Sequence, residues 1–195
     1  MSASTTPPSR RADAERNVAA IVAAGLDVLA TRPDAGLSAV AEAAGVTRTT
    51  VYAHFPTRAA LVGAVLDAAI AEAAAALDGA EPDSGPPDVA LARMVAASWQ
   101  TIDRQGRLME AVGQVLSEAE CHARHRPVGE RVARTLRRGQ DEGRFRDDVP
   151  IDWLLAVTYA LVHAAAAEVA AGRLPAERAG ELAGASVLAA CAAPR

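Results

Sequence analysis

The chain has 195 residues and a net charge of −4, and its composition is 51% apolar but only 3% aromatic. Such a length fits one compact unit or a small domain joined to a larger one, with a core made of close contacts between Ala-rich helices. Residues 1–58 carry six Arg and five acidic side chains, a net +1, whereas the rest carries 14 Arg and 19 acidic side chains, a net −5. The acidic body disfavours indiscriminate nucleic-acid binding everywhere except at the basic N-terminal end. Scattered charge on an ordinary solvated surface would explain the same numbers.

Cysteine usage and the lack of a targeting pattern predict a cytoplasmic protein. Cys121 and Cys191 lie far apart and form no CxxC pair, and residues 1–11 contain no apolar run typical of a signal peptide. The longest apolar run, residues 151–171, is interrupted by three polar residues. We therefore expect a helix buried in protein and no membrane partner.

The first residues predict a tail followed by a helix. Residues 1–9 are polar and contain two Pro, which is typical of a disordered segment, and Arg10 and Arg11 follow directly. Two interpretations of this arm stay open: it contacts phosphates or the minor groove of DNA, or it is an inert solvated tail. From Asp13 to about Thr31, apolar residues recur at helical spacing, which predicts the first helix.

Residues 37–61 (LSAVAEAAGVTRTTVYAHFPTRAAL) have the pattern of two short helices joined by a tight turn. Ala41 is small enough for the second helix to cross the first closely, and Gly45 is able to take the positive φ that ends the first helix. Thr47 is expected to cap the second helix with its hydroxyl. A helix-turn-helix of this kind presents the first turns of its second helix to the DNA major groove. The expected core of the domain, residues 10–56, consists of Ile21, Leu26, Leu29, Val40, Val51 and Phe55.

The segment 46–61 resembles the DNA-binding motif of the TetR family of one-component transcriptional regulators. The matching residues are Thr47, Thr50, Val51, Tyr52, Phe55, Thr57 and Leu61. Two positions depart from the family's pattern: Thr49 stands where Gly is common, and Arg58 replaces the usual Lys while keeping a cation for a phosphate. The motif covers the first third of the chain. The resemblance implies an all-helical homodimer that binds DNA and is released by a small molecule.

The remainder of the chain continues the helical pattern. A fourth helix over residues 57–78 has no breaker, spans roughly 30 Å and is expected to connect the DNA-binding domain to the body. Residues 79–195 are expected to form a ligand-binding and dimerisation domain with helices over residues 88–103, 108–119, 127–142, 151–171 and 175–191. Residues 120–126 are expected to be irregular. No strand is predicted, so the expected fold class is all-α with about nine helices.

The last two helices differ from the others because they have little polar surface. Residues 151–171 are apolar nearly all round, and a helix without a polar face must be covered on every side. Gly180, Gly184, Ala185 and Ala189 allow close approach along the final helix. We expect these two helices to form a homodimer interface with their two-fold mates. A helix buried inside a monomer is the alternative.

The exposed residues of the motif are the expected DNA contacts. Arg48 is expected to bond guanine O6 and N7, and Thr49 to touch a base edge or a thymine methyl. Phosphate contacts that set the register are expected from Thr47, Thr50, Tyr52, His54 and Arg58, and Ser38 completes the DNA-binding set. Two recognition helices related by a two-fold axis would select a palindromic operator in double-stranded DNA.

No pattern of catalytic or metal-binding residues stands out. Cys121 and His125 share one helical face at i, i+4, but zinc needs three or four ligands, so we interpret them as polar residues of a surface loop. The sequence has no Ser-His-Asp order, Gly-rich phosphate loop or HExxH motif. We therefore expect no enzyme activity, no cofactor and no metal.

An effector pocket is expected among mostly apolar residues of the body with a few polar groups. The candidates are Met94, Trp99, Met109, Val112, Leu116, Tyr159 and His163. The same residues would also serve as core. For His163, a satisfied core position is favoured over a polar anchor in the pocket.

Together these expectations describe a transcriptional regulator, as repressor or as activator, that a small-molecule effector releases from its operator. By the resemblance, release is allosteric: the ligand favours a state in which the fourth helix swings and the recognition helices no longer match the groove spacing. Two other classes stay open. One is a helical enzyme or small-molecule-binding protein without DNA function, and the other is a helix-turn-helix used only for protein contact.

Overall fold

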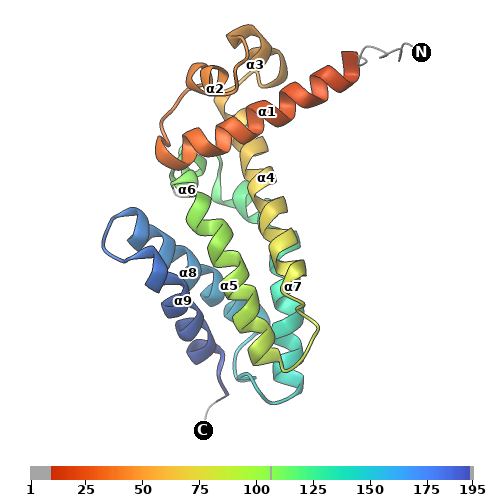
Figure 1. Cartoon of the computed structure of the whole chain (residues 1–195). Coiled ribbons are helices and arrows are strands. Elements are labelled where there is room, and N and C mark those ends of the chain that lie inside the picture. Colours follow the sequence, from red (N-terminus) through yellow and green to blue (C-terminus); the bar gives the residue numbers. More distant parts are fainter. Residues whose placement is uncertain (1–9, 106, 194–195) are drawn as a thin grey trace, which may run out of the picture. The chain divides into compact units, whose positions relative to one another are not determined.

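The computed structural model describes residues 10–105 and 107–193, and this part of the chain is all-α (Figure 1). Its nine helices are α1 (Arg10–Thr31), α2 (Leu37–Ala43), α3 (Arg48–His54), α4 (Arg58–Gly79), α5 (Pro87–Gln105), α6 (Leu108–Gly113), α7 (Glu118–Asp141), α8 (Ile151–Ala170) and α9 (Ala176–Cys191). These described residues contain no strand, only an isolated antiparallel bridge between Phe145 and Ala192. The predicted fold class is confirmed. The tail at residues 1–9 and the side chains of Arg10 and Arg11 lie outside the described part.

The chain divides into two compact units. The first takes in the chain up to Leu66 together with Leu108–Leu116, and the second takes in Asp67–Arg107 and Ser117–Arg195. The division differs from the expected boundaries, because α4 is shared between the units and α6 joins the N-terminal unit. The chain therefore passes from one unit to the other three times.

In the first unit, α1 packs against α2, α3 and α6. Of the expected core residues, Ile21, Leu29, Val40, Val51 and Phe55 are buried, and Leu26 is half-buried. Gly25 of α1 lies close to α4, where an added Cβ would come within 2.7 Å of Val65 Cγ2. The lack of a side chain at this position lets the two helices approach each other.

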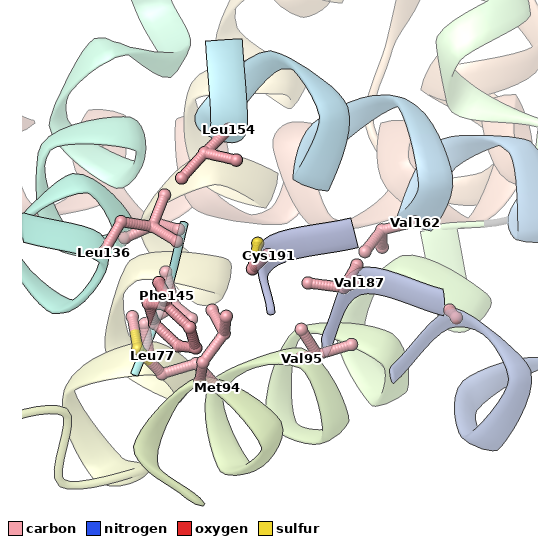
Figure 2. Packing of buried hydrophobic residues seen from close by; sticks show 12 residues of the cluster. Leu77, Met94, Val95, Leu136, Phe145, Leu154, Val162, Val187 and Cys191 are labelled. Atoms are coloured by element: carbon pink, nitrogen blue, oxygen red, sulfur yellow. The ribbon is translucent and has the colours of Figure 1, made fainter. Parts of the chain in front are cut away.

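The second unit contains a cluster of buried apolar side chains, contributed mainly by α4, α5, α7, α8 and α9 (Figure 2). The cluster consists of Leu77, Leu91, Met94, Val95, Val132, Leu136, Phe145, Leu154, Val162, Ala183, Val187 and Cys191. Phe145 follows α7 and packs directly over Gly139, where an added Cβ would collide with the ring. Burial also raises the pKa of the Cys191 thiol, so this cysteine is a small apolar core residue.

Two helix boundaries in the middle of the chain differ from the prediction. The helix expected over residues 108–119 ends at Gly113, and residues 120–126, expected to be irregular, belong to α7. A capping box starts α7 early: the Ser117 hydroxyl accepts a hydrogen bond from the Glu120 N–H at 3.3 Å, and the Glu120 carboxylate accepts one from the Ser117 N–H at 2.9 Å. A hydrogen bond from the Ser117 hydroxyl to the Glu120 carboxylate at 2.6 Å, together with the bond from the Ser117 N–H, lowers the pKa of Glu120.

Pro127 lies inside α7 and does not open it as predicted. A proline in a helix interior removes one backbone hydrogen bond, so other interactions must keep the helix in place. Arg124 and Arg131, on either side of the proline, form ion pairs with Asp67 and Asp78 of α4. The hydrogen bond from Arg131 lowers the pKa of Asp78. The two ion pairs attach α7 to α4 before and after Pro127.

α4 and α8 are both long and apolar. By length and mean hydropathy alone, 1.8 for α4 and 1.5 for α8, each would pass as a membrane span, a test that core helices of soluble proteins also pass. In α4, 39% of the tested stretch is buried within the chain, but in α8 only 17% is buried. The alternative of α8 as a helix buried inside one chain is therefore wrong. Its uncovered side chains include Trp153, 60% exposed, and Tyr159, 41% exposed.

Candidate nucleic-acid interface and effector site

Backbone hydrogen bonds at Gly45 close the turn of the helix-turn-helix. Gly45 has a φ of +67°, which confirms the predicted left-handed conformation. Its N–H donates to the Glu42 carbonyl at 3.1 Å, and the Val46 N–H donates to the Ala41 carbonyl at 3.0 Å. This pair of bonds is a Schellman motif, which satisfies the last carbonyls of α2. The turn therefore sets the direction in which the chain enters α3.

Thr47 caps α3, as predicted. Its Oγ1 accepts a hydrogen bond from the Thr50 N–H at 3.1 Å and lies 2.8 Å from Thr50 Oγ1. The Thr47 backbone is extended, with φ −75° and ψ 153°, so the helix begins directly at Arg48. The cap satisfies one of the free N–H groups at the start of the recognition helix.

α3 presents polar side chains outward and an apolar side chain inward. Val51 is completely buried, and Phe55, directly after the helix, is 7% exposed. The expected DNA contacts are all in the first unit: Ser38, Thr47, Arg48, Thr49 and Tyr52 are exposed, and Thr50, His54 and Arg58 are half-buried. Tyr52 is 48% exposed, which leaves its ring largely uncovered. An exposed guanidinium among hydroxyl groups is suited to base edges and phosphates.

The half-buried residue Arg58 has partners that sequence reasoning missed. Its Nε donates to the Ala35 carbonyl at 3.2 Å, and its Nη2 donates to the Pro33 carbonyl and to Gln114 Oε1, the latter at 3.1 Å. All three acceptors lie in the first unit. The motif indicated a cation at this position but carried no signal for acceptors that lie far away in the sequence.

The residues expected to line an effector pocket are divided between the two units. Three of them belong to the first unit: Met109, Val112 and Leu116. Met94 and Trp99 of α5 are buried in the second unit, 1% and 8% exposed. The sulfur of Met94 accepts a hydrogen bond from the Thr135 hydroxyl at 3.3 Å, and Trp99 packs against Gly180. Met94 and Trp99 are therefore packed as core residues.

Tyr159 and His163 of α8 form a cluster of rings with His125 of α7. The ring centroids of Tyr159 and His163 lie 4.1 Å apart, and those of His125 and Tyr159 lie 5.5 Å apart with the rings at 82°. Burial, with a smaller effect of His125, lowers the pKa of His163 to about 4. Burial also raises the pKa of Tyr159 to about 12, with a further contribution from Cys121. His163 and Tyr159 are therefore both neutral near pH 7.

Cys121 and His125 lie in α7, so their assignment to a loop is wrong. His125 Nδ1 lies 2.8 Å from the Cys121 carbonyl oxygen and 3.6 Å from the Cys121 sulfur, and burial raises the pKa of the thiol. Within residues 10–105 and 107–193, no group of three or more His, Cys, Asp or Glu could hold a metal ion.

The second unit has an open hollow of about 600 Å³ between α4 and α5. It is lined by Glu72, Ala75, Ala76, Gly79, Ala80, Arg93, Ala96, Ala97, Gln100 and Thr101, none of which was predicted. The Arg93 guanidinium is held by the carbonyls of Ala80, Glu81 and Ser84 at 2.7 to 2.9 Å. Glu72 provides a carboxylate at the hollow. The sequence signal was the run of alanines on both helices, whose small side chains leave space between them.

Comparisons with known proteins agree with this geometry. Residues 21–65 match the sequence profile of bacterial regulatory proteins of the tetR family. The chain is 32% identical over 163 residues to the HTH-type transcriptional repressor LfrR of Mycolicibacterium smegmatis, and the match covers 82% of each chain.

Solved structures show the same likeness. The crystal structure of the TetR-like transcriptional regulator LfrR from Mycobacterium smegmatis in complex with proflavine matches with a TM-score of 0.72 and 30% identity, over 90% of this chain and 96% of that chain. A TetR family transcription regulator from Marinobacter aquaeolei matches with a TM-score of 0.73 and 16% identity, over 93% and 98%. At 16% identity, the second likeness concerns the fold alone.

Proposed function

From the premise that this chain belongs to the TetR family of bacterial regulatory proteins and is a DNA-binding transcriptional regulator, we propose that it is a cytoplasmic repressor that a small molecule releases from a palindromic operator. The observation that carries the proposal is the outward face of α3, where exposed Arg48 and Thr49 follow a capped helix start. The identity to the repressor LfrR supports repression over activation. The proposal includes no catalytic step.

On the operator, α3 reads the major groove. Arg48 bonds a guanine through O6 and N7, and Thr49 contacts a base edge or a thymine methyl. Phosphates are contacted by Ser38, Thr47, Thr50, Tyr52 and His54, which set the register without reading sequence. The Thr47 and Thr50 hydroxyls already form a hydrogen bond with each other, in which one of them donates. Only the other hydroxyl therefore still has its hydrogen free to donate to a phosphate.

The operator is palindromic because the active species is a homodimer. Support comes from the uncovered apolar side chains of α8 and α9, among them Trp153, Tyr159 and Leu182, the last 42% exposed. An isolated chain rarely leaves such a set of apolar side chains open to water. Covering each of them with a second copy would stabilise the assembly, because burial of apolar surface lowers the free energy. We therefore assign α8 and α9 to the dimer interface.

The effector is a flat organic cation that binds in the hollow between α4 and α5. Three features support this class: the Glu72 carboxylate, the alanine lining that admits a thin molecule, and a volume of about 600 Å³. The likeness to LfrR, whose solved complex contains proflavine, provides the probe. Four of the residues expected from the sequence lie in the same unit but do not line this hollow: Met94, Trp99, Tyr159 and His163. The proposed effector site therefore differs from the site that the sequence predicted.

Proflavine titration, followed by the fluorescence of the dye, tests the effector site. We expect Glu72→Gln to weaken binding about three- to tenfold, because it removes the charge that attracts the cation. Glu130→Gln, which removes an exposed charge on α7, is the matched control and should bind the dye as the wild type does. Equal dye affinities of the wild type and both variants would contradict an effector site in this hollow.

Selection of bound duplexes from a random DNA pool tests the function itself. We expect enrichment of an inverted repeat whose half-site centres lie about 34–36 Å apart or a multiple of this distance. A direct repeat would contradict the two-fold dimer. Failure to enrich any duplex would contradict DNA binding and leave a helical small-molecule-binding protein.

A further inference from the structure

Arg58, the first residue of α4, connects two segments of the first unit that are distant in the sequence. Its Nε and Nη2 donate to the carbonyls of Ala35 and Pro33 in the loop between α1 and α2. Nη2 also donates to Gln114 Oε1, directly after the end of α6. A guanidinium offers several donors in one rigid plane, whereas the single ammonium of the Lys usual in the family's motif is a point charge on a flexible stem.

The loop that Arg58 holds determines where α2 begins. Gly36 is the N-cap of α2 and makes no side-chain cap hydrogen bond, so the helix start is not fixed by its own cap. The carbonyls of Pro33 and Ala35, just before this cap, are instead fixed by the guanidinium. α2 packs against α3, with Val40 and Val51 completely buried. A shift of the loop would therefore move the surface on which the recognition helix rests.

The third acceptor belongs to a segment that enters the first unit from the second. The chain crosses into the first unit at Leu108 and leaves it after Leu116. Within this segment, α6 packs against α1 and buries Leu108, Ala111 and Val112. The segment that contains Gln114 therefore continues at both ends into chain that belongs to the second unit. The bond between Gln114 and Arg58 connects this segment with the loop before α2.

We propose that Arg58 is a positioning residue and not a phosphate ligand, and that its bond to Gln114 makes the placement of α2 and α3 depend on the α6 segment. The proposal rests on the proposed operator binding and names how that binding responds to the second unit. A displacement of residues 108–116 pulls on Gln114, frees the loop carbonyls from Arg58 and loosens the start of α2. DNA affinity then falls although no DNA contact is lost.

Hydrogen–deuterium exchange of the full chain tests this link without DNA. Arg58→Lys keeps the charge but loses the planar fork, and Gln114→Ala removes the third acceptor. We expect both to speed exchange in the loop and the first turn of α2 by about fivefold or more, since Arg58→Lys loses the planar donors for the loop carbonyls and Gln114→Ala loses the acceptor that helps to keep the guanidinium in place. Gln114→Glu keeps an acceptor for the guanidinium and should restore slow exchange. Arg32→Gln, which removes an exposed guanidinium from the same loop, is the matched control.

Operator binding of the same variants separates positioning from phosphate contact. On the duplex enriched from the random pool, Arg58→Lys and Gln114→Ala should each bind about three- to tenfold more weakly with an unchanged dependence on salt. A phosphate ligand behaves differently: Arg58→Lys would keep the affinity, and Arg58→Gln would lower the slope of log K against log salt by about one.

Each outcome decides the proposal. Wild-type exchange in Arg58→Lys or in Gln114→Ala would overturn the link between α6 and α2. If Arg58→Lys binds the operator with wild-type affinity, the positioning role is wrong and Arg58 is a phosphate ligand. If no duplex is enriched, operator binding fails as a function, while the exchange experiment still supports or overturns the link.

Discussion

The indole of Trp99 on α5 lies directly against the backbone of Gly180 on α9, where an added Cβ would come within 2.6 Å of its Cδ1 atom. Trp99 is 8% exposed, so the ring has little room to move away. α5 and α9 pack against each other in the second unit, and this contact sets how closely they approach.

Gly180→Ala should therefore destabilise the protein by about 1–3 kcal/mol, because the new methyl group overpacks a filled site. Gly184→Ala, on the same helix, is the control: its Cβ would lie 3.9 Å from Val95, an ordinary contact. That substitution should stabilise by about 0.5–1 kcal/mol, since Ala is a better helix former than Gly. Urea unfolding of both variants measures the difference. Equal stability of the two would contradict the packing argument.

Arg48→Ala should change the sequence preference of DNA binding. The loss of the proposed bidentate contact to guanine should cost about 1–3 kcal/mol on the preferred operator and relax one base pair in each half-site. Competition binding with operators substituted one base pair at a time measures this pattern. Arg137→Ala, at an exposed position of α7, should behave as the wild type. A uniform loss across all operators would assign Arg48 to a phosphate.

Trp153→Glu should dissociate the proposed dimer. Trp153 is 60% exposed on α8, and a charge placed there would be desolvated against the second copy. Sedimentation velocity should show a dimer for the wild type at micromolar concentration and a 20.0 kDa species for the variant. Val89→Glu, at a 46% exposed position on α5, is the control and should stay dimeric. A monomeric wild type would contradict the assigned interface.

The protonation of His163 should make the protein less stable in mild acid. Its pKa is about 4 in the folded chain, below the ordinary value of 6.5, because of burial and, less, of His125. Between these two values, the unfolded chain binds a proton that the folded chain does not bind. The free energy of unfolding therefore falls as pH drops through 6.5 and levels off near 4.

His163→Phe keeps a ring against Tyr159 but does not titrate, so it isolates this effect. Relative to the variant, the wild type should lose about 1–3 kcal/mol between pH 7 and pH 4.5. Carboxylates with lowered pKa values, such as Asp78 and Asp148, lose their stabilising effect only at lower pH and do so in both proteins. Parallel stability curves for the two proteins would show that His163 is not buried as a neutral group.

The sequence by itself determined those features that neighbouring residues decide. Helical periodicity predicted the fold class, the glycine at position 45 predicted the left-handed turn, and Thr47 predicted the cap of α3. The outward position of Arg48 and Thr49 and the buried position of Val51 follow from the same local pattern. These predictions succeeded because a turn, a cap and a helix face depend on residues within one or two turns of each other.

Only the tertiary structure decided the features that depend on contacts across the chain. In the tertiary structure, α6 belongs to the first unit, and α7 continues through Pro127 with ion pairs to α4. Arg58 has hydrogen-bond partners at Pro33, Ala35 and Gln114. The hollow lies between α4 and α5 and is lined by none of the predicted pocket residues. Neither an acceptor 56 residues away nor the space between two helices has a signature in local periodicity. Such features arise from the packing of whole elements, in which shape and distance, and not spacing along the chain, determine which side chains meet.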